Sequence, residues 1–337
     1  YSYDLFFKEV DQLAALFQTQ MGIKKGDRVA IASRNNPQWC VAFMATVLVG
    51  AIAVPINSWG KTEELTYAIT DSGASILVAD EARLQLLEGG FAGLGVAAIV
   101  IEPGQAIDLP NVQSYAQAVK AGEGHSYTVD QPQPDDNCLI LYTSGSTGFP
   151  KGVAHRHIAV CQALFNMLFV GMLTMEVEGG VREYKGGATA ETPMLTVPLF
   201  HGTGLVSGLL VPMQMGQKVV MVYKWETVKA LELIQNEKIT GLTTVPAVMQ
   251  EMLNHPEFDN FNIQSLIRLG IAGAATPAGL PELIREKIGE PSRSSGWGMT
   301  ETMVIGSTMS GAVYDVCPQS AGVQSPICEM RFADPDG

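Results

Sequence analysis

Short β-branched runs alternate with helical patterns along most of this chain, and that alternation limits its possible folds more than any other feature. Strands are predicted at 28–32, 51–54, 75–79, 97–101, 139–142, 194–197, 218–222, 241–244 and 269–272. Between them, residues 225–236 and 281–288 place apolar side chains at helical spacing. Strands that alternate with crossover helices form parallel sheets. The sequence therefore predicts an α/β fold whose mostly parallel sheets are covered by helices on both faces.

Two polar stretches interrupt this alternation. Residues 128–137 contain a Gln-Pro-Gln-Pro-Asp-Asp run, and residues 176–193 are rich in glycine, charge and threonine. Both compositions are typical of surface connections. We expect the first stretch to separate two lobes, 1–130 and 137–337, and the second to be a mobile insertion.

An uncharged run from residue 39 to residue 56 is long enough to raise the alternative of a membrane span. Asn36-Pro37 is typical of a helix start and Gly50 of a helix stop, and a short apolar run follows at 51–54. This punctuation favours a buried helix followed by a buried strand, so no transmembrane segment is predicted. The chain opens on Tyr1 rather than on methionine, so a targeting signal cannot be judged.

Composition excludes several classes of function. With 47% hydrophobic and 16% charged residues, the chain has enough apolar side chains for a packed core. Its net charge of -13 repels phosphate backbones and anionic membrane surfaces, so nucleic acid is not an expected partner. Five cysteines without a Cys-x-x-Cys pair favour a reducing cytoplasm. The close pair His155 and His157 does not share a helix face, so these residues do not predict a zinc site.

A loop rich in glycine and hydroxyl groups follows the predicted strand 139–142. Residues 143–152 read Thr-Ser-Gly-Ser-Thr-Gly-Phe-Pro-Lys-Gly. Glycine lets the backbone approach an anion, hydroxyls donate to phosphate oxygens, and Lys151 supplies a positive charge. A Walker loop needs Ser or Thr after its lysine, whereas Gly152 stands there. A flexible linker would not explain the preceding strand, so we predict a phosphate loop of a different kind.

Residues 142–153 resemble the signature of the adenylate-forming superfamily, which includes acyl- and aryl-CoA synthetases, firefly luciferase and the adenylation domains of peptide synthetases. Four further segments occur in the family's order: 26–30 (Gly-Asp-Arg-Val-Ala), 198–201 (Pro-Leu-Phe-His), 273–275 (Gly-Ala-Ala) and 297–302 (Trp-Gly-Met-Thr-Glu-Thr). The resemblance implies a large AMP-binding (adenylating) domain over 1–337. It also implies two α/β lobes of mostly parallel sheet sandwiched by helices, plus part of a small β-barrel subdomain.

The resemblance also implies a role for each matching residue. The phosphate loop, which would hold the β- and γ-phosphates of ATP, comprises Thr143, Ser144, Gly145, Ser146, Thr147, Gly148 and Lys151. The adenosine and α-phosphate segment comprises Gly273, Ala274, Ala275, Trp297, Gly298, Met299 and Thr300. Within it, Trp297 would stack on the adenine and Thr300 would touch the α-phosphate. Glu301 would bind Mg²⁺, which prefers hard oxygen ligands. Catalytic roles are expected for Thr143, Lys151, His201, Thr300 and Glu301.

His201 stands in a predicted strand-to-helix turn, where a histidine is more often structural. The resemblance implies that His201 orients or screens the carboxylate, with Phe200, Gly204 and residues 245–247 walling an apolar acyl tunnel. Residues 197–210 contain no acidic side chain that could hold an amino group. We therefore expect an aliphatic or aryl acid rather than an amino acid as substrate.

The implied reaction has two steps. A carboxylate attacks the α-phosphorus of ATP to form an acyl-adenylate, and the thiol of CoA then attacks the acyl carbonyl. The expected ligands are ATP, Mg²⁺, CoA and a small carboxylic acid, and a homodimer is left open. Three alternatives remain: transfer to a carrier-protein phosphopantetheine, oxidation of the adenylate, and nucleotide binding without turnover.

Some segments of the family pattern are missing from the sequence. A Tyr-x-x-Gly-Asp segment, whose Asp would hold the ribose, and a small carboxy-terminal domain with an adenylation lysine do not occur in it. We expect the 337 residues alone to fold but to be nearly inactive in overall ligation, since the lysine acts on the transition state.

Overall fold

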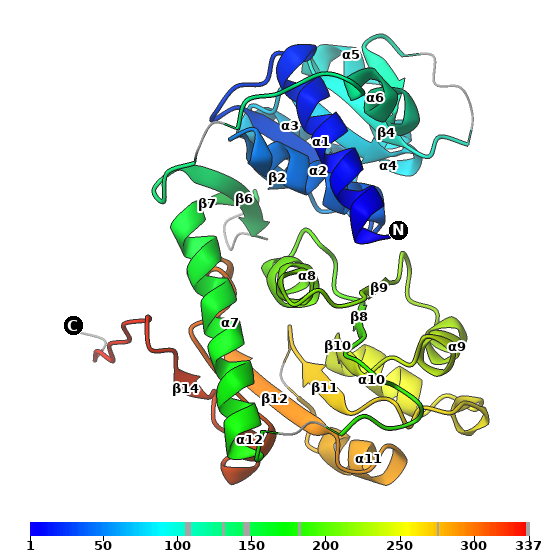
Figure 1. Ribbon diagram of the computed structural model, residues 1–337, viewed down its shortest axis with the longest axis vertical. Coiled ribbons are helices and arrows are strands. Elements are labelled where there is room, and N and C mark those ends of the chain that lie inside the picture. Colours follow the sequence, from blue (N-terminus) through cyan, green and yellow to red (C-terminus); the bar gives the residue numbers. More distant parts are fainter. Residues whose placement is uncertain (105–108, 130–131, 144–148, 181–182, 275, 335–337) are drawn as a thin grey trace. The chain divides into compact units, whose positions relative to one another are not determined.

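The structure, a computed structural model, describes residues 1–104, 109–129, 132–143, 149–180, 183–274 and 276–334. The chain divides into two compact units, Tyr1–Ala159 and Val160–Gly337, which we call unit 1 and unit 2. Each is built on its own sheet, and Figure 1 labels the helices and strands of both.

Unit 1 holds a sheet with the strand order β5-β4-β3-β1-β2-β6-β7. Its strands are β1 (Arg28–Ala32), β2 (Ile52–Pro55), β3 (Ile76–Asp80), β4 (Ala97–Ile101), β5 (Val112–Ser114), β6 (Asn137–Thr143) and β7 (Lys151–Arg156). Its helices are α1 (Tyr3–Thr19), α2 (Pro37–Leu48), α3 (Thr62–Ser72), α4 (Glu81–Leu87), α5 (Phe91–Leu94) and α6 (Tyr115–Gly122). All neighbouring strands are parallel except β6 and β7, which form an antiparallel hairpin.

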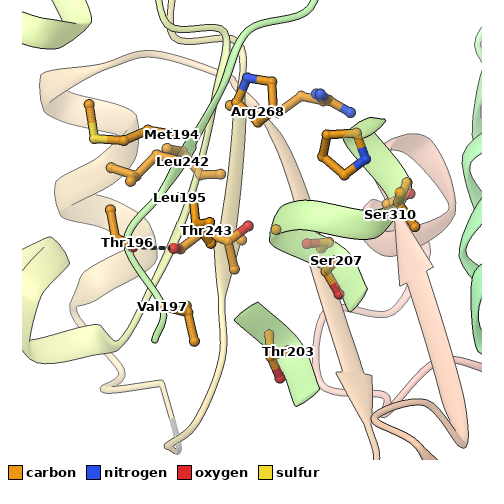
Figure 2. Close-up of a pocket in the computed structure, with 18 of the residues that line it drawn as sticks. Met194, Leu195, Thr196, Val197, Thr203, Ser207, Leu242, Thr243, Arg268 and Ser310 are labelled. Atoms are coloured by element: carbon orange, nitrogen blue, oxygen red, sulfur yellow. Dashed lines mark hydrogen bonds between the residues drawn. The ribbon is translucent and has the colours of Figure 1, made fainter. Parts of the chain in front are cut away.

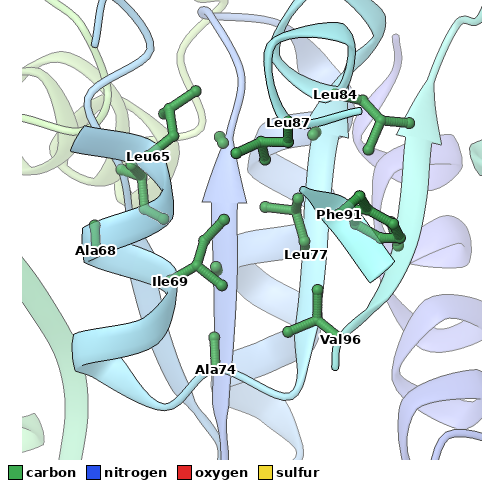
Figure 3. Packing of buried hydrophobic residues seen from close by; sticks show 14 of the residues in the cluster. Leu65, Ala68, Ile69, Ala74, Leu77, Leu84, Leu87, Phe91 and Val96 are labelled. Carbon is green, nitrogen blue, oxygen red and sulfur yellow. The ribbon is translucent and has the colours of Figure 1, made fainter. Parts of the chain in front are cut away.

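Helices cover both faces of this first sheet, as the apolar strands predict. On one face, α3, α4 and α5 pack Leu65, Leu84 and Phe91 against strand residues such as Leu77, and Figure 3 shows this cluster. On the other face, α2 contacts β1 and β2, and α6 contacts β4, while α1 packs against both helices. Burial of these side chains away from water is the main force that holds such a layer together.

The run at 39–56 is a buried helix followed by a strand, as the sequence predicts. Helix α2 begins at Pro37, and Asn36 Oδ1 accepts a hydrogen bond from the Trp39 amide at 2.7 Å. Trp39 is fully buried, and Gly50 adopts φ 74° before β2. The cap, the first-turn proline and the left-handed glycine are the expected helix-end signals.

The second unit contains a sheet with the strand order β14-β13-β12-β11-β10-β8-β9. Its strands are β8 (Pro193–Leu195), β9 (Val220–Met221), β10 (Gly241–Thr244), β11 (Arg268–Ile271), β12 (Ser292–Trp297), β13 (Ser307–Ser310) and β14 (Val323–Gln324). Its helices are η1 (Gly204–Leu210, a π-helix), α8 (Val211–Gln214), α9 (Thr227–Glu237), α10 (Pro246–Leu253), η2 (Phe258–Asn260), α11 (Leu280–Lys287), η3 (Thr300–Thr302) and α12 (Gly311–Val316). Strands β9, β8, β10, β11 and β12 are parallel, and β13 and β14 continue the sheet antiparallel. Helices α9, α10 and α11 bury a core against one face of this sheet.

Helix α7 (His157–Val177) begins at the end of unit 1 and runs into unit 2. By length and composition it is the one described helix that could cross a bilayer, with a window of mean hydropathy 1.9 that is 22% buried. Those two properties are weak evidence for a span, because core helices share them. Its buried face carries Thr174, whose Oγ1 lies 2.5 Å from Ser310 Oγ of β13.

Each of the predicted strands overlaps a strand of the structure, and three of them (β1, β4 and β10) have the predicted bounds. The division of the chain falls at Ala159/Val160, later than the expected break between residues 130 and 137. The reason is that β6 pairs in parallel with β2, so the strand expected to open the second lobe joins the first sheet. The described strands form two sheets, and the β-barrel subdomain stays a prediction.

Candidate functional site

The expected site segments of unit 2 follow the carboxyl ends of neighbouring parallel strands. His201 follows β8, Val245 follows β10, Gly273 and Ala274 follow β11, and Trp297 ends β12. These strands are adjacent in the order β8-β10-β11-β12, so their carboxyl ends lie at one edge of the sheet. Open α/β sheets bind their ligands in the crevice outside that edge. The fold therefore brings together residues that lie about a hundred positions apart in the sequence.

The His201 turn is shaped by backbone contacts. The His201 amide donates to Pro198 O at 3.0 Å, and the Leu205 amide donates to His201 O at 3.0 Å, which leads the chain into η1. A Cβ on Gly204 would lie 2.3 Å from Pro198 O, so only glycine fits this close approach. A π-helix such as η1 is rare and often marks a functional site.

The His201 ring lies against Phe200, with ring centroids 4.4 Å apart and planes inclined by 47°. His201 keeps an exposed surface, yet partial burial lowers the pKa of its imidazole below the ordinary value because desolvation disfavours the charged ring. A neutral imidazole beside an apolar ring can donate or accept one hydrogen bond without adding a charge to the site.

The adenine segment begins with a left-handed glycine. Gly273 adopts φ 82°, a conformation that residues with a side chain rarely take, and its position lies beside the Val245 side chain. Ala274 is exposed at this turn, and Ala275 lies outside the described residues.

The segment after β12 is a tight turn. A Cβ on Gly298 would lie 1.6 Å from Val304 O, so the backbone of the returning chain occupies the place of a side chain. The Met299 amide donates to Thr302 Oγ1 at 2.9 Å, and η3 follows. Trp297 is 48% exposed, and Glu301 is also exposed, so an aromatic face and a carboxylate are both accessible at this end of β12.

Two residues at the end of the same turn have strained backbone conformations. Met303 has φ 49° and Val304 has φ 81°, although neither is glycine and Val304 is β-branched. Such conformations cost of order 1–3 kcal/mol each and occur preferentially at functional sites. The sequence gives no signal for them, and our reading of the motif did not include these two residues.

In unit 1, the segment predicted to be a phosphate loop begins at the end of β6 and ends at the start of β7. Thr143 pairs with Lys151 across the hairpin, and Thr143 Oγ1 donates to Lys151 O at 3.4 Å. Lys151 is exposed and forms no ion pair among the residues that the structure describes. The predicted phosphate ligands Ser144, Gly145, Ser146, Thr147 and Gly148 lie outside the described residues.

The strand that leads into this loop is held by Tyr142. Its hydroxyl donates to Asp71 Oδ2 at 2.7 Å. Desolvation, followed by this bond to a carboxylate, raises the pKa of the Tyr142 phenol above its ordinary value. The phenol therefore stays protonated and keeps the end of β6 attached to α3. Beside it, Phe149 stacks on Tyr67 at 5.1 Å between ring centroids.

Unit 2 also contains a cavity of about 230 Å³ between its sheet, η1 and α7. Figure 2 shows Val197 and Thr203 toward one end of the cavity, Arg268 at the other, and Ser207 and Ser310 at its side. Val197, Thr203 and Gly204 flank the His201 turn in sequence. Of the tunnel walls that we expected, Gly204 lines this cavity, whereas Phe200 and residues 245–247 do not. Sequence reasoning missed most of the lining, because it comes from five separate strands, β8, β10, β11, β12 and β13, and from the helices α7, η1 and α8.

The described residues contain no group of three or more His, Cys, Asp or Glu side chains that could hold a metal ion. Glu301 is a single exposed carboxylate. Mg²⁺ commonly binds through one or two carboxylates plus substrate phosphates and water, so one carboxylate fits this ion only when nucleotide is also bound. Glu301 is therefore compatible with Mg²⁺ delivered together with ATP.

The chain is similar in sequence to curated CoA ligases. The chain is 27% identical over 325 residues to 4-coumarate-CoA ligase 1 of Narcissus pseudonarcissus, covering 94% of this chain and 56% of that protein. It is 28% identical over 319 residues to the long-chain-fatty-acid–CoA ligase FadD13 of Mycobacterium tuberculosis, covering 95% and 59%. The chain thus spans somewhat more than half the length of the curated relatives it matches.

Solved structures share the fold along almost the whole chain. The anthranilate CoA ligase AuaEII in complex with anthranoyl-AMP superposes with a TM-score of 0.84 at 25% identity, covering 99% of this chain and 61% of that one. The N-terminal domain of FACL13 from Mycobacterium tuberculosis superposes with a TM-score of 0.77 at 24% identity, covering 96% and 75%. The AMP-binding enzyme family matches residues 1–337, and the chain therefore belongs to that family.

Proposed function

We propose that the protein activates a carboxylic acid with ATP through an acyl-adenylate and then forms a thioester with CoA. The observation that carries this proposal is the alignment of His201, Gly273 and Trp297–Glu301 at the carboxyl ends of adjacent parallel strands. The named relatives, which include a feruloyl-CoA synthase 28% identical to this chain, support the same class of reaction.

Each segment has a chemical task in this proposal. Trp297 offers an exposed aromatic face on which adenine can stack, and the backbone at Gly273 and Ala274 borders the base. Thr300 donates a hydroxyl to the α-phosphate. Lys151, an exposed cation beside the phosphate loop, offsets charge on the β- and γ-phosphates as pyrophosphate leaves.

Glu301 would hold Mg²⁺ together with the phosphates, and the ion would supply charge neutralisation at the reacting phosphate. The chain's own contribution is positioning. In this proposal the tight turn at Gly298 would position Thr300 and Glu301, and His201, in contact with Phe200, would orient the carboxylate. No protein nucleophile is needed, because the acid oxygen and the thiol are the attacking groups.

The test is isotope exchange between pyrophosphate and ATP, followed by an assay for the CoA ester, on the intact protein. We expect octanoate or benzoate to support exchange better than any amino acid does, because residues 197–210 offer no carboxylate for an ammonium group. Thioester should then form with CoA. If amino acids are the better substrates, the acid assignment fails. If exchange occurs and only a phosphopantetheine carrier accepts the acyl group, the acceptor is a carrier protein.

A further inference from the structure

Helix α3 of unit 1 is held in place from two directions. Its apolar side chains Leu65, Ala68 and Ile69 are buried in the cluster that Figure 3 shows. At its carboxyl end, Arg28 of β1 donates to Ser72 O at 2.8 Å. A cation is favourable there because the last carbonyls of a helix carry partial negative charge. Groups on the remaining surface of α3 therefore project from a fixed support.

Asp71 connects this helix to the end of β6. Tyr142 Oη donates to Asp71 Oδ2 at 2.7 Å, and Tyr67 Oη donates to Asp71 Oδ1 at 3.4 Å. Tyr67 and Asp71 are four residues apart in α3, so they lie on one side of the helix. A hydrogen bond to a carboxylate is stronger than one between neutral groups. Of the two bonds, the one from Tyr142 is the shorter, and it joins β6 to α3.

Tyr67 also contacts the segment that leads into β7. Its ring stacks on Phe149, with the planes inclined by 26°, and the Tyr142 ring lies edge-on to it at 6.5 Å between centroids. Stacked and edge-to-face aromatic pairs are both favourable. Phe149 is 69% exposed, and the stack places its ring against α3. One side of α3 therefore contacts both arms of the β6–β7 hairpin.

Gly152 leaves the space that the Tyr142 ring occupies. Tyr142 pairs with Gly152 across the hairpin, and Thr143 pairs with Lys151. A Cβ on Gly152 would lie 3.0 Å from Ile140 Cγ2 and 3.4 Å from Tyr142 Cζ. The first distance is shorter than most real Cβ contacts, so a side chain at this position would press on both residues. The glycine after Lys151 thus lets the Tyr142 ring lie against β7 and still reach α3.

The two contacts with α3 flank Lys151 in the hairpin. Tyr142 directly precedes Thr143, the partner of Lys151 across the hairpin, and Phe149 lies two residues before the lysine. The Lys151 side chain is exposed, and a lysine ammonium sits on a flexible four-carbon stem. The region that such an ammonium can reach is set by its backbone, so a contact that holds both arms of the hairpin also limits where the charge lies.

We propose that Asp71 and Tyr67 are positioning residues for Lys151: through Tyr142 and Phe149 they hold the end of the hairpin where the lysine meets the phosphates of ATP. The phosphate role of Lys151 rests on the function proposed above. The attachment of the hairpin to α3 is a property of unit 1 and can be measured without turnover.

The first test measures amide hydrogen exchange of residues 151–156 by mass spectrometry on the intact protein. Asp71→Ala and Tyr142→Phe both remove the bond between α3 and β6, so we expect these amides to exchange about tenfold faster. Tyr127→Phe is the matched control, because Tyr127 Oη donates to Asp11 Oδ1 of α1 at 2.6 Å, a bond of the same kind in the same unit. It should leave the exchange of 151–156 unchanged. Unchanged exchange in Asp71→Ala as well would overturn the proposal.

The second test asks whether the attachment acts through Lys151. Pyrophosphate exchange is measured for Tyr142→Phe, Lys151→Ala and the double variant. We expect Tyr142→Phe to lower the rate about tenfold when Lys151 is present and less than about twofold in the Lys151→Ala background, because no charge is then left to position. Loss by the same factor in both backgrounds would show a merely structural role and would overturn the proposal. If Lys151→Ala exchanges too slowly to measure, the same comparison is made on ATP affinity by calorimetry and decided by the same criterion.

Conservative variants separate the two contacts. Asp71→Asn keeps one oxygen that can accept from Tyr142, so it should lose less pyrophosphate exchange than Asp71→Ala does. Tyr67→Phe keeps the stack on Phe149 and should stay within about twofold of the unaltered protein, whereas Tyr67→Ala removes the stack and should lose more. Tyr127→Phe should again have no effect. Equal losses in Asp71→Asn and Asp71→Ala would count against the hydrogen bond as the cause.

Failure of the proposed function would look different from failure of this inference. In that case the unaltered protein would exchange pyrophosphate with no carboxylic acid, and the positioning role would fall with it, whatever the hydrogen exchange of 151–156. If the unaltered protein is active and the variants match it, the function stands and the positioning role is wrong.

Discussion

Adding a single methyl group at Gly298 should strongly lower activity while the protein stays folded. The Cβ of Gly298→Ala would lie 1.6 Å from Val304 O and 2.4 Å from Val304 C, whereas real Cβ atoms essentially never approach within 3.0 Å. The contact is with backbone, so no rotamer change relieves it. Because φ at Gly298 is not in the left-handed region, the substitution tests space alone. The two strands of the turn must separate by more than about 1 Å.

That displacement falls between the residues proposed to contact the base and the α-phosphate. A misplacement of about 1 Å can cost about 100-fold in rate, which corresponds to about 2.7 kcal/mol of transition-state stabilisation. Overpacking of this kind lowers the free energy of unfolding by about 1–3 kcal/mol, which leaves unit 2 folded if its stability is ordinary. We therefore expect pyrophosphate exchange to fall by about 100-fold and the thermal midpoint to fall by several degrees.

The assay is pyrophosphate exchange at saturating acid, with thermal unfolding measured on the same preparations. Gly279→Ala is the matched control, because Gly279 is exposed, has φ -83°, and has nothing within 4 Å of its Cβ position. It should leave both quantities unchanged. Exchange by Gly298→Ala within threefold of the unaltered protein would refute the argument that this turn positions the reacting groups.

Three further outcomes are expected. Glu301→Gln should lower pyrophosphate exchange by about 100-fold or more with little change in thermal stability, because it removes the proposed Mg²⁺ ligand from an exposed position; unchanged exchange would refute that role. Asp80→Ala should lower the free energy of unfolding by about 3–5 kcal/mol in urea titrations, because it leaves the buried Arg83 guanidinium without its ion-pair partner. Asp259→Ala, which removes an exposed partner of Lys287, should change that free energy by less than about 1 kcal/mol, and equal effects would contradict the burial argument. Burial lowers the pKa of His201, so the stability that its neutral imidazole contributes is fully present above the ordinary histidine pKa and is lost as the pH falls through the folded-state pKa. Between pH 7 and pH 5, the free energy of unfolding of His201→Gln should therefore fall less steeply than that of the unaltered protein. Identical pH profiles of the two proteins would contradict this expectation.

The sequence alone determined the class of fold, because the strong signals were local. β-branched runs such as 28–32 and 97–101 form parallel strands that are buried except at their first residue, so pattern and structure coincide there. Asn36, Pro37 and Gly50 fixed the ends of α2 through capping and backbone geometry that depend on few neighbours.

Elements that depend on tertiary contacts were not visible in the sequence. β12 reads Ser-Arg-Ser-Ser-Gly-Trp, which has little strand propensity, yet it pairs with β11 and β13 and carries the site turn. Packing overrode propensity there. For the same reason β6 joined the first sheet, although the polar stretch before it had suggested a boundary between lobes.

The cavity of unit 2 shows the same limit most clearly. Gly241, Gly270 and Ser294 are unremarkable in sequence, and each comes from a different strand. Only the register of three strands puts them on one face, and only the close approach of η1 makes the space above that face a cavity. A local pattern predicts which residues could bind phosphate, whereas the shape of a cavity depends on distances between segments far apart in the chain, and those distances are set by packing.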